Sequence, residues 1–195
     1  MPNTNAPRGF KPRKDAIGSA WSSTLNSYPL PSGYATSIFT GDVAKVLTTG
    51  YVAKAAAGDQ FRGVVAGFKY TGTDGRTISS PVWLAGTVTQ NGKDAQVLVQ
   101  DDPNTVFEAQ FTNSATIPTA SVQGKTFNLF DAGGVPVTGL SGEGIDLTTQ
   151  GVGAQQFRCI GFATRPDNDI TAAGGANSYG LFVPALHDFR VNTGI

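Results

Sequence analysis

Residues 42–68 read DVAKVLTTGYVAKAAAGDQFRGVVAGF and contain three short runs of small and β-branched residues. Gly50 and the pair Gly58-Asp59 separate these runs, and glycine-bearing turns between such runs are typical of β-hairpins. A shorter version recurs over residues 147–162, with the words Leu-Thr-Thr and Gln-Phe-Arg and a closing Gly-Phe in the same order. The repetition is compatible with a duplication or with chance, and both halves are predicted to be β modules.

Composition extends this prediction to the whole chain. Of its 195 residues, 25 are glycine and 11 are proline, and only 14% are charged. Abundant turn residues indicate many short strands, and no window of a dozen residues has apolar positions at helical spacing without a glycine or proline inside. The predicted fold class is mainly β: one or two small antiparallel β-barrel or sandwich modules, preceded by an extended N-terminal arm.

Three segments are predicted along the chain. Residues 1–36 form the arm, because their five prolines exclude a central strand while their large apolar residues are unlike a flexible linker. The first β module covers residues 37–109 and the second residues 110–195, with one joint core as an alternative. The arm is expected to lie on its own core, on a neighbouring subunit or on a partner, and a short helix over residues 15–26 is an option.

Charge is distributed unevenly, although the formal net charge is zero. Residues 1–20 carry a net charge of +3, and the rest of the chain carries −3. A basic tail on an acidic body typically binds an acidic surface or nucleic acid. Because no aromatic stacking platform is interleaved with the basic residues, we predict no nucleic-acid partner. The alternative is a solvated terminus that binds nothing.

Catalytic and cofactor signatures are missing from the sequence. His187 is the only histidine and Cys159 the only cysteine, which removes most metal sites, catalytic dyads and disulfides. No nucleophile elbow, Rossmann or P-loop fingerprint occurs. We therefore predict no enzyme, no catalytic residue, no cofactor and no metal. Calcium at residues 101–104 or 167–169 is an alternative to simple turn chemistry there.

Cellular context is predicted from similar arguments. No apolar stretch is long enough to span a bilayer, and the first 20 residues lack a signal peptide's apolar segment. With a single cysteine, these features predict a soluble protein made in a reducing cytoplasm, without a membrane partner. Trp83 and Tyr70, beside a glycine-rich loop, are a possible carbohydrate platform, but the apolar neighbours of Trp83 favour core packing.

Several glycine-rich segments resemble the cement or decoration proteins of tailed bacteriophages, which bind the outside of the capsid shell. The segments that carry the resemblance are residues 41–43, 50–53, 57–59, 63–67, 99–108, 158–162, 165–169 and 181–183, with His187 in a polar tail. The resemblance implies a structural virion protein that is synthesised in the host bacterial cytoplasm. It implies a homotrimer that binds the major capsid protein on the capsid exterior and stabilises its lattice.

Contacts with the capsid are expected from the arm, because arginine and aromatic residues dominate the energy of protein interfaces. The candidate contact residues are Arg8, Phe10, Arg13, Trp21 and Tyr28. An alternative function is another virion surface module, such as a tail, neck or carbohydrate-adhesion protein. A cell-wall hydrolase is a third option, which the missing motifs disfavour.

Overall fold

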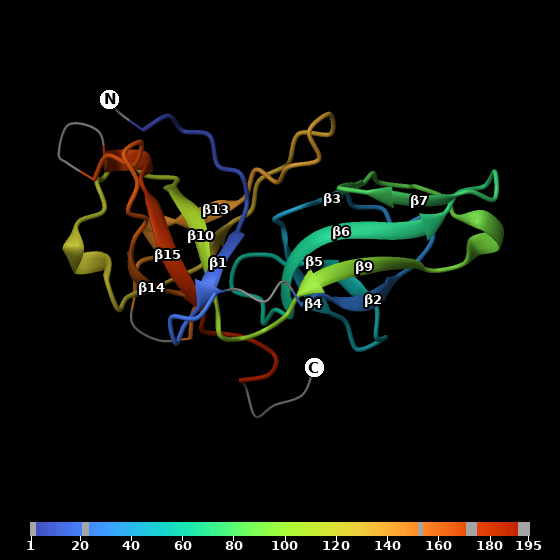
Figure 1. The fold of residues 1–195 in the computed structure, drawn as a ribbon, viewed down its shortest axis with the longest axis horizontal. Coiled ribbons are helices and arrows are strands. Elements are labelled where there is room, and N and C mark those ends of the chain that lie inside the picture. Colours follow the sequence, from blue (N-terminus) through green and yellow to red (C-terminus); the bar gives the residue numbers. More distant parts are fainter. Residues whose placement is uncertain (1–2, 21–23, 152–153, 171–174, 191–195) are drawn as a thin grey trace.

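The structure is a computed structural model that describes residues 3–20, 24–151, 154–170 and 175–190. Within these ranges the chain forms short β-strands, single turns of 3-10 helix and no α-helix. The predicted mainly β fold is confirmed. No helix in the described part of the chain is long and apolar enough to cross a membrane. The strands form two bodies that lie side by side along the long axis of the molecule (Figure 1).

The first body, at the left of Figure 1, is a nearly closed sheet that we call the barrel. Its path is β11-β14-β15-β10-β13-β12, with β1 paired to β10 off that path. Its strands are β1 (Lys11–Asp15), β10 (Thr105–Thr112), β11 (Thr126–Phe127), β12 (Leu129–Phe130), β13 (Gly144–Asp146), β14 (Phe157–Phe162) and β15 (Tyr179–Pro184). Only Asn128 separates β11 from β12, so the two ends of the path are joined and the sheet curls on itself.

The second body, at the right of Figure 1, is the curved sheet β2-β9-β6-β4-β5, with β7 paired to β6. Its strands are β2 (Asn26–Leu30), β4 (Val43–Val46), β5 (Val52–Lys54), β6 (Gly63–Thr71), β7 (Thr77–Ser80) and β9 (Ala95–Gln100). A two-stranded sheet of β3 (Ile38–Phe39) and β8 (Val82–Trp83) accompanies it. The long strands β6 and β9 form the centre of this body.

Two tight turns are formed at Asp74-Gly75 and at Asn91-Gly92. Gly75, at φ +82°, closes the hairpin between β6 and β7. Asn91 and Gly92 both have positive φ, at 54° and 67°, and the Lys93 amide donates to the Gln90 carbonyl at 3.1 Å. Positive φ at both central residues is the geometry that favours Asn-Gly in a two-residue turn.

The described part of the N-terminal segment is built into both bodies. β1 pairs antiparallel with β10, and β2 pairs antiparallel with β9. Of the positions expected for the arm, its own core is therefore the one observed. The described residues of the 15–26 stretch contain no helix. A turn replaces it, because Gly18 takes φ +95° and the Asp15 carboxylate accepts a hydrogen bond from the Ile17 amide at 3.2 Å.

The two bodies share one apolar core. The Phe10 ring stacks on Phe157 with centroids 4.4 Å apart, and Phe61 packs on the same ring at 4.8 Å. Phe61 and Phe157 belong to the two Gln-Phe-Arg words of the sequence, one in each half. The 109/110 boundary predicted between modules falls inside β10. The molecule is therefore organised as two sheets with a common core.

A second apolar cluster fills the curved sheet. Trp83 is fully buried there, and Phe68 packs beside it with ring centroids 6.3 Å apart. Tyr70 contacts the Trp83 ring edge-on at 5.4 Å. Core packing of Trp83 is thus confirmed, and its ring is not available as a surface platform for carbohydrate.

Four charged residues meet at the junction of the bodies, and we call them the junction cluster: Asp42, Lys54, Asp131 and Glu143. The Lys54 ammonium lies 2.7 Å from Asp131 Oδ1, 3.2 Å from Glu143 Oε1 and 3.9 Å from Asp42 Oδ2. The side chains of Asp42 and Glu143 are fully buried. Burial raises the pKa of both carboxyls, and the Lys54 charge opposes that effect. Because an unpaired buried charge is costly, Lys54 is central to the stability of this junction.

Backbone bonds tie the same carboxylates to the curved sheet. Glu143, which comes just before β13 of the barrel, accepts a hydrogen bond from the Val43 amide at 2.9 Å. Asp42 accepts one from the Phe39 amide, also at 2.9 Å. Glu143 of the barrel therefore accepts the hydrogen bond of the first backbone amide of β4, and this bond links the two sheets directly.

Candidate functional site

Strand β1 lies at the seam between the two bodies (Figure 1). It carries three of the four basic residues of the arm. Lys11, Arg13 and Lys14 are exposed on it, and Arg8 is exposed just before it. Arg165, from the loop after β14, approaches the same region, because it binds Glu108 of β10 next to Arg13. We call these five residues the basic face: Arg8, Lys11, Arg13, Lys14 and Arg165.

A close approach of two glycines sets the position at which β1 begins. Gly9 has φ +70°, and a β-carbon placed on it would lie 2.6 Å from the Gly41 carbonyl oxygen. Only glycine fits such a contact without a shift of the backbone. The neighbouring Phe10 amide donates to the same carbonyl at 2.9 Å. This pairing inserts the Phe10 ring into the shared core and directs the next residues along the seam.

Glu108 fixes β1 to the barrel by charge. The carboxylate is 5% exposed and is bound from both sides, by Arg13 Nε at 2.9 Å and by an Arg165 terminal nitrogen at 2.8 Å. Arg165 also pairs with Asp167 at 3.0 Å and lies 4.3 Å from the centre of the Tyr179 ring. Charge-assisted hydrogen bonds to a buried carboxylate are stronger than exposed ion pairs. The basic face is therefore held in a defined position.

The remaining cations of the face have no such partner. Within the described residues, Arg8, Lys11 and Lys14 form no ion pair. Partial burial lowers the pKa of Lys11, and the positive charges of Arg8 and Arg13 lower it further. An anion placed beside Lys11 would relieve this repulsion. The face is suited to a negatively charged ligand or surface.

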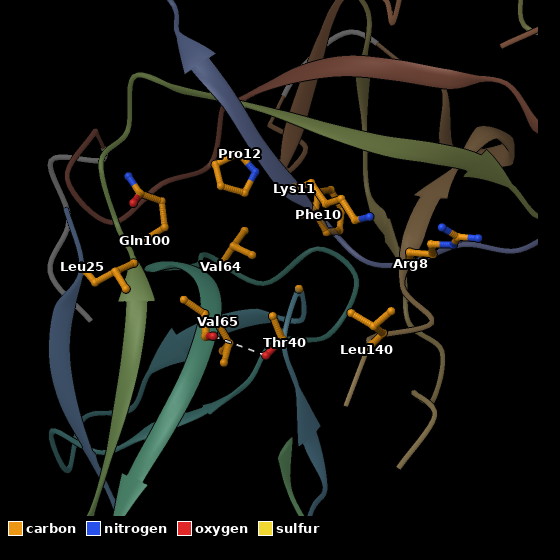
Figure 2. A pocket seen from close by; sticks show the side chains of 12 residues that line it. Arg8, Phe10, Lys11, Pro12, Leu25, Thr40, Val64, Val65, Gln100 and Leu140 are labelled. Atoms are coloured by element: carbon orange, nitrogen blue, oxygen red, sulfur yellow. Dashed lines mark hydrogen bonds between the residues drawn. The ribbon is translucent and has the colours of Figure 1, made fainter. Parts of the chain in front are cut away.

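An apolar groove of about 300 Å³ opens along the seam next to these cations. Its floor is formed by three buried side chains, Phe10, Val64 and Val65. Figure 2 shows Arg8, Lys11 and Leu140 toward one end of the groove, and Leu25 and Gln100 toward the other. Ala66, which is exposed, also lines it. The groove thus combines an apolar floor with a basic end.

A second hollow lies on the other side of Arg8 and Lys11. It measures about 390 Å³, and Arg165, Asp167 and Tyr179 contribute to its lining. Its lining is polar, whereas the groove is apolar. Arg8 and Lys11 line both the groove and the second hollow, so they lie between an apolar surface and a polar one.

The predicted contact residues have different positions in the structure. Arg8 is at the end of the groove, and Arg13 is 46% exposed while bound to Glu108. Phe10, at 1% exposed, belongs to the core, so its ring is not the exposed anchor that was expected and can be approached only from within the groove that it lines. Trp21 lies outside the described residues. Only Arg8 and Arg13 of the set are brought together on the basic face.

Tyr28 lies on β2 in a different environment. Its hydroxyl donates to the Asp101 carboxylate, and the Arg62 guanidinium lies 5.5 Å from the centre of its ring. Burial, the largest cause, and the nearby Asp101 raise the pKa of Tyr28 to about 12. Arg62 in turn pairs with Asp188 at 3.0 Å and lies over the Phe189 ring at 4.4 Å. Tyr28 therefore helps to hold the C-terminal segment against the curved sheet.

Sequence reasoning missed several residues of the site. In the sequence, Lys11 is one of several basic residues of the arm and nothing distinguishes it from its neighbours. No local pattern marks Arg165 or Ala66 as part of this site. Arg165 is identified only by its bond to Glu108, which is 57 residues away in sequence. Long-range pairing of β1 with β10 assembles the site, and a local pattern does not encode that pairing.

Both candidate calcium loops are engaged in bonds of the fold. Asp101 accepts from the Asn26 amide group at 2.9 Å, and Asp102 accepts from the Asn104 backbone amide at 2.8 Å. Asn168 bonds the backbone of Tyr179 through both ends of its side chain. Turn and scaffold chemistry accounts for these residues. Among the described residues, no group of three or more His, Cys, Asp or Glu is placed to hold a metal ion.

The site can hold a negative charge and an apolar side chain at adjacent positions. Both features border strand β1, which is fixed by backbone pairing and by the bond between Arg13 and Glu108, so the face is formed before any partner binds. Comparison of the chain with protein-family models, with curated proteins and with solved structures found no match.

Proposed function

We propose that this chain is a structural protein of a bacteriophage virion. It binds the outer surface of the capsid as a homotrimer and stabilises the lattice of the major capsid protein. The observation that carries the proposal is the basic face beside an apolar groove, with Arg8, Lys11 and Lys14 free of ion pairs in the described chain. Such a face is suited to an acidic protein surface. The resemblance of the glycine-rich segments to decoration proteins supplies the capsid as that surface.

Such a protein acts through the thermodynamic linkage between its binding and the stability of the assembled lattice. A protein that binds only the assembled lattice stabilises that state by mass action. Three copies in one trimer bind more tightly than one, because each attached copy raises the effective concentration of the next. The fixed position of β1 limits the entropy lost on attachment. In this proposal the chain is made in the host cytoplasm and then resides on the capsid exterior.

Attachment to shells tests the proposal directly. The purified protein is expected to have three times the 20.2 kDa mass of one chain and to co-sediment with expanded shells of its capsid protein. Lys11→Glu should weaken attachment by about tenfold or more, because a like charge then faces an acidic surface. The affinity of the unaltered protein should fall as salt rises.

Lys69→Glu and Lys93→Glu are matched controls, because both lysines are exposed and lie outside the basic face. These variants should attach as the unaltered protein does. Failure of the unaltered protein to sediment with shells would exclude the proposal. Equal losses for Lys11→Glu and the two controls would exclude the basic face as the attachment surface.

A further inference from the structure

We propose that the groove binds an extended, acidic segment of the capsid protein. One apolar side chain of that segment inserts onto the floor formed by Phe10, Val64 and Val65, and a carboxylate nearby pairs with Arg8 and Lys11. The inference rests on the proposed function and specifies which part of the partner the basic face recognises.

The dimensions of the groove favour a short segment. Its volume of about 300 Å³ is at the lower end of the range for binding pockets. In an extended segment, alternate side chains point to the same side and lie about 7 Å apart. A residue that fills the apolar floor therefore leaves the side chain two positions away free to reach the basic end at Arg8 and Lys11 (Figure 2).

The groove is formed in advance by the core of the molecule. Phe10 stacks on Phe157, and Val64 and Val65 are buried in β6. The Gly9–Gly41 approach fixes the backbone at the start of β1. Because the floor residues are packed into the core, the groove needs no prior rearrangement of this chain to receive the apolar anchor of the partner.

Charge complementarity indicates the occupant of the groove, because Arg8 and Lys11 form no ion pair within the described residues and fit a carboxylate of a partner. Several carboxylates of this chain are already paired within it: Asp59 with Lys45, Asp131 with Lys54, Asp167 with Arg165 and Asp188 with Arg62. A second copy that offered one of these carboxylates to Lys11 would have to break its pair. A second copy that offered a carboxylate outside these pairs, such as the exposed Asp94, is distinguished from the capsid segment by the cross-linking experiment below.

Carbodiimide cross-linking tests the inference on the unaltered protein, because it joins a lysine amine only to a carboxylate in contact with it. The protein is attached to shells, treated with the carbodiimide and digested for mass spectrometry. Lys11 is expected to be linked to an aspartate or glutamate of the capsid protein that lies within two residues of a large apolar residue. A link from Lys11 to another copy of this chain, or no link from Lys11 in protein that has sedimented with shells, would overturn the inference while leaving the proposed function intact.

A groove-filling variant gives a second, independent measurement. Ala66→Trp occupies the groove from an exposed position, and Ala85→Trp adds the same ring at another exposed alanine, outside the groove. Ala66→Trp should attach to shells at least tenfold more weakly and lose the Lys11 cross-link, while Ala85→Trp keeps both. Equal attachment of the two variants would overturn the inference. If the unaltered protein does not sediment with shells, the proposed function fails, and the inference fails with it.

Discussion

Replacement of Lys54 by methionine is expected to cost about 3–5 kcal/mol of unfolding free energy near neutral pH. Lys54 is the cation that faces two fully buried carboxylates, Asp42 and Glu143, with Glu143 Oε1 at 3.2 Å. Methionine is unbranched, is shorter than lysine by one atom and has no charge, so the carboxylates either remain buried without a cation or take up protons. Urea unfolding followed by circular dichroism measures the loss.

The pH dependence of this loss identifies its cause. Burial already raises the pKa of Asp42 and Glu143. A carboxyl with a raised folded-state pKa contributes most stability below its unfolded pKa and loses that contribution as pH rises through the folded value. Without Lys54 the folded pKa rises further, so Lys54→Met should be closer to the unaltered protein at about pH 5 than at about pH 7.5.

Lys45→Met is the matched control for the junction cluster. Lys45 is also on the curved sheet and pairs with Asp59 at 2.7 Å, but both side chains of that pair are about 30% exposed. A partly exposed pair typically contributes about 0–1 kcal/mol. If Lys45→Met and Lys54→Met lose the same free energy, buried charge does not explain the junction.

His187 is expected to make the protein less stable as pH falls from about 6.5 to about 4. The imidazole is fully buried, and burial lowers its pKa from 6.5 to about 4. A group with a lowered folded-state pKa contributes stability above its unfolded pKa and loses it as pH falls through the folded value. The difference between the two pKa values corresponds to about 3 kcal/mol.

His187→Asn isolates this contribution. His187 Nδ1 accepts a hydrogen bond from the Phe189 amide at 3.1 Å, and an asparagine oxygen can accept the same bond. The stability of the unaltered protein, relative to the variant, should therefore fall by about 3 kcal/mol between pH 7 and pH 4. The comparison with the variant is needed because Asp42 and Glu143 act in the opposite direction over part of that range. A constant difference at all pH values would contradict the assignment.

Local features of the fold could be predicted from the sequence because they depend on neighbouring residues. Asn91-Gly92 and Asp74-Gly75 form turns in the structure, because Asn91, Gly92 and Gly75 take a positive φ that asparagine and glycine readily adopt. Strand content followed from glycine-separated runs of small and β-branched residues. The burial of Trp83 followed from its apolar neighbours in a strand.

Long-range features could not be predicted in this way. Phe10 lies between Gly9 and Lys11 in a segment rich in proline and arginine, which is typical of a tail. Its burial depends on the pairing of Lys11 with Glu108 and on the ring of Phe157. Polar and apolar residues alternate along part of β10, which is typical of a strand with one exposed face, but Glu108 and Gln110 are buried as well as Phe107 and Phe111. The cause is the N-terminal segment, whose Ala6 amide donates to Gln110 at 3.0 Å.

The candidate site also depends on long-range packing and could not be predicted from local patterns. Its arginine and lysine residues are visible as an excess of charge in residues 1–20, but the groove beside them is not. The groove is lined by residues from the arm, from β6 and from the loop that contains Leu140. Only the packing of the two bodies brings these segments together.

Lysine footprinting on shells tests most directly whether the basic face is the surface that binds. The protein is labelled with an amine-reactive reagent, free and attached to shells, and each lysine is quantified by mass spectrometry. Lys11 and Lys14 should lose reactivity on attachment, while Lys69 and Lys93 should react as in the free protein. Protection of Lys69 and Lys93, with Lys11 and Lys14 unchanged, would contradict the account.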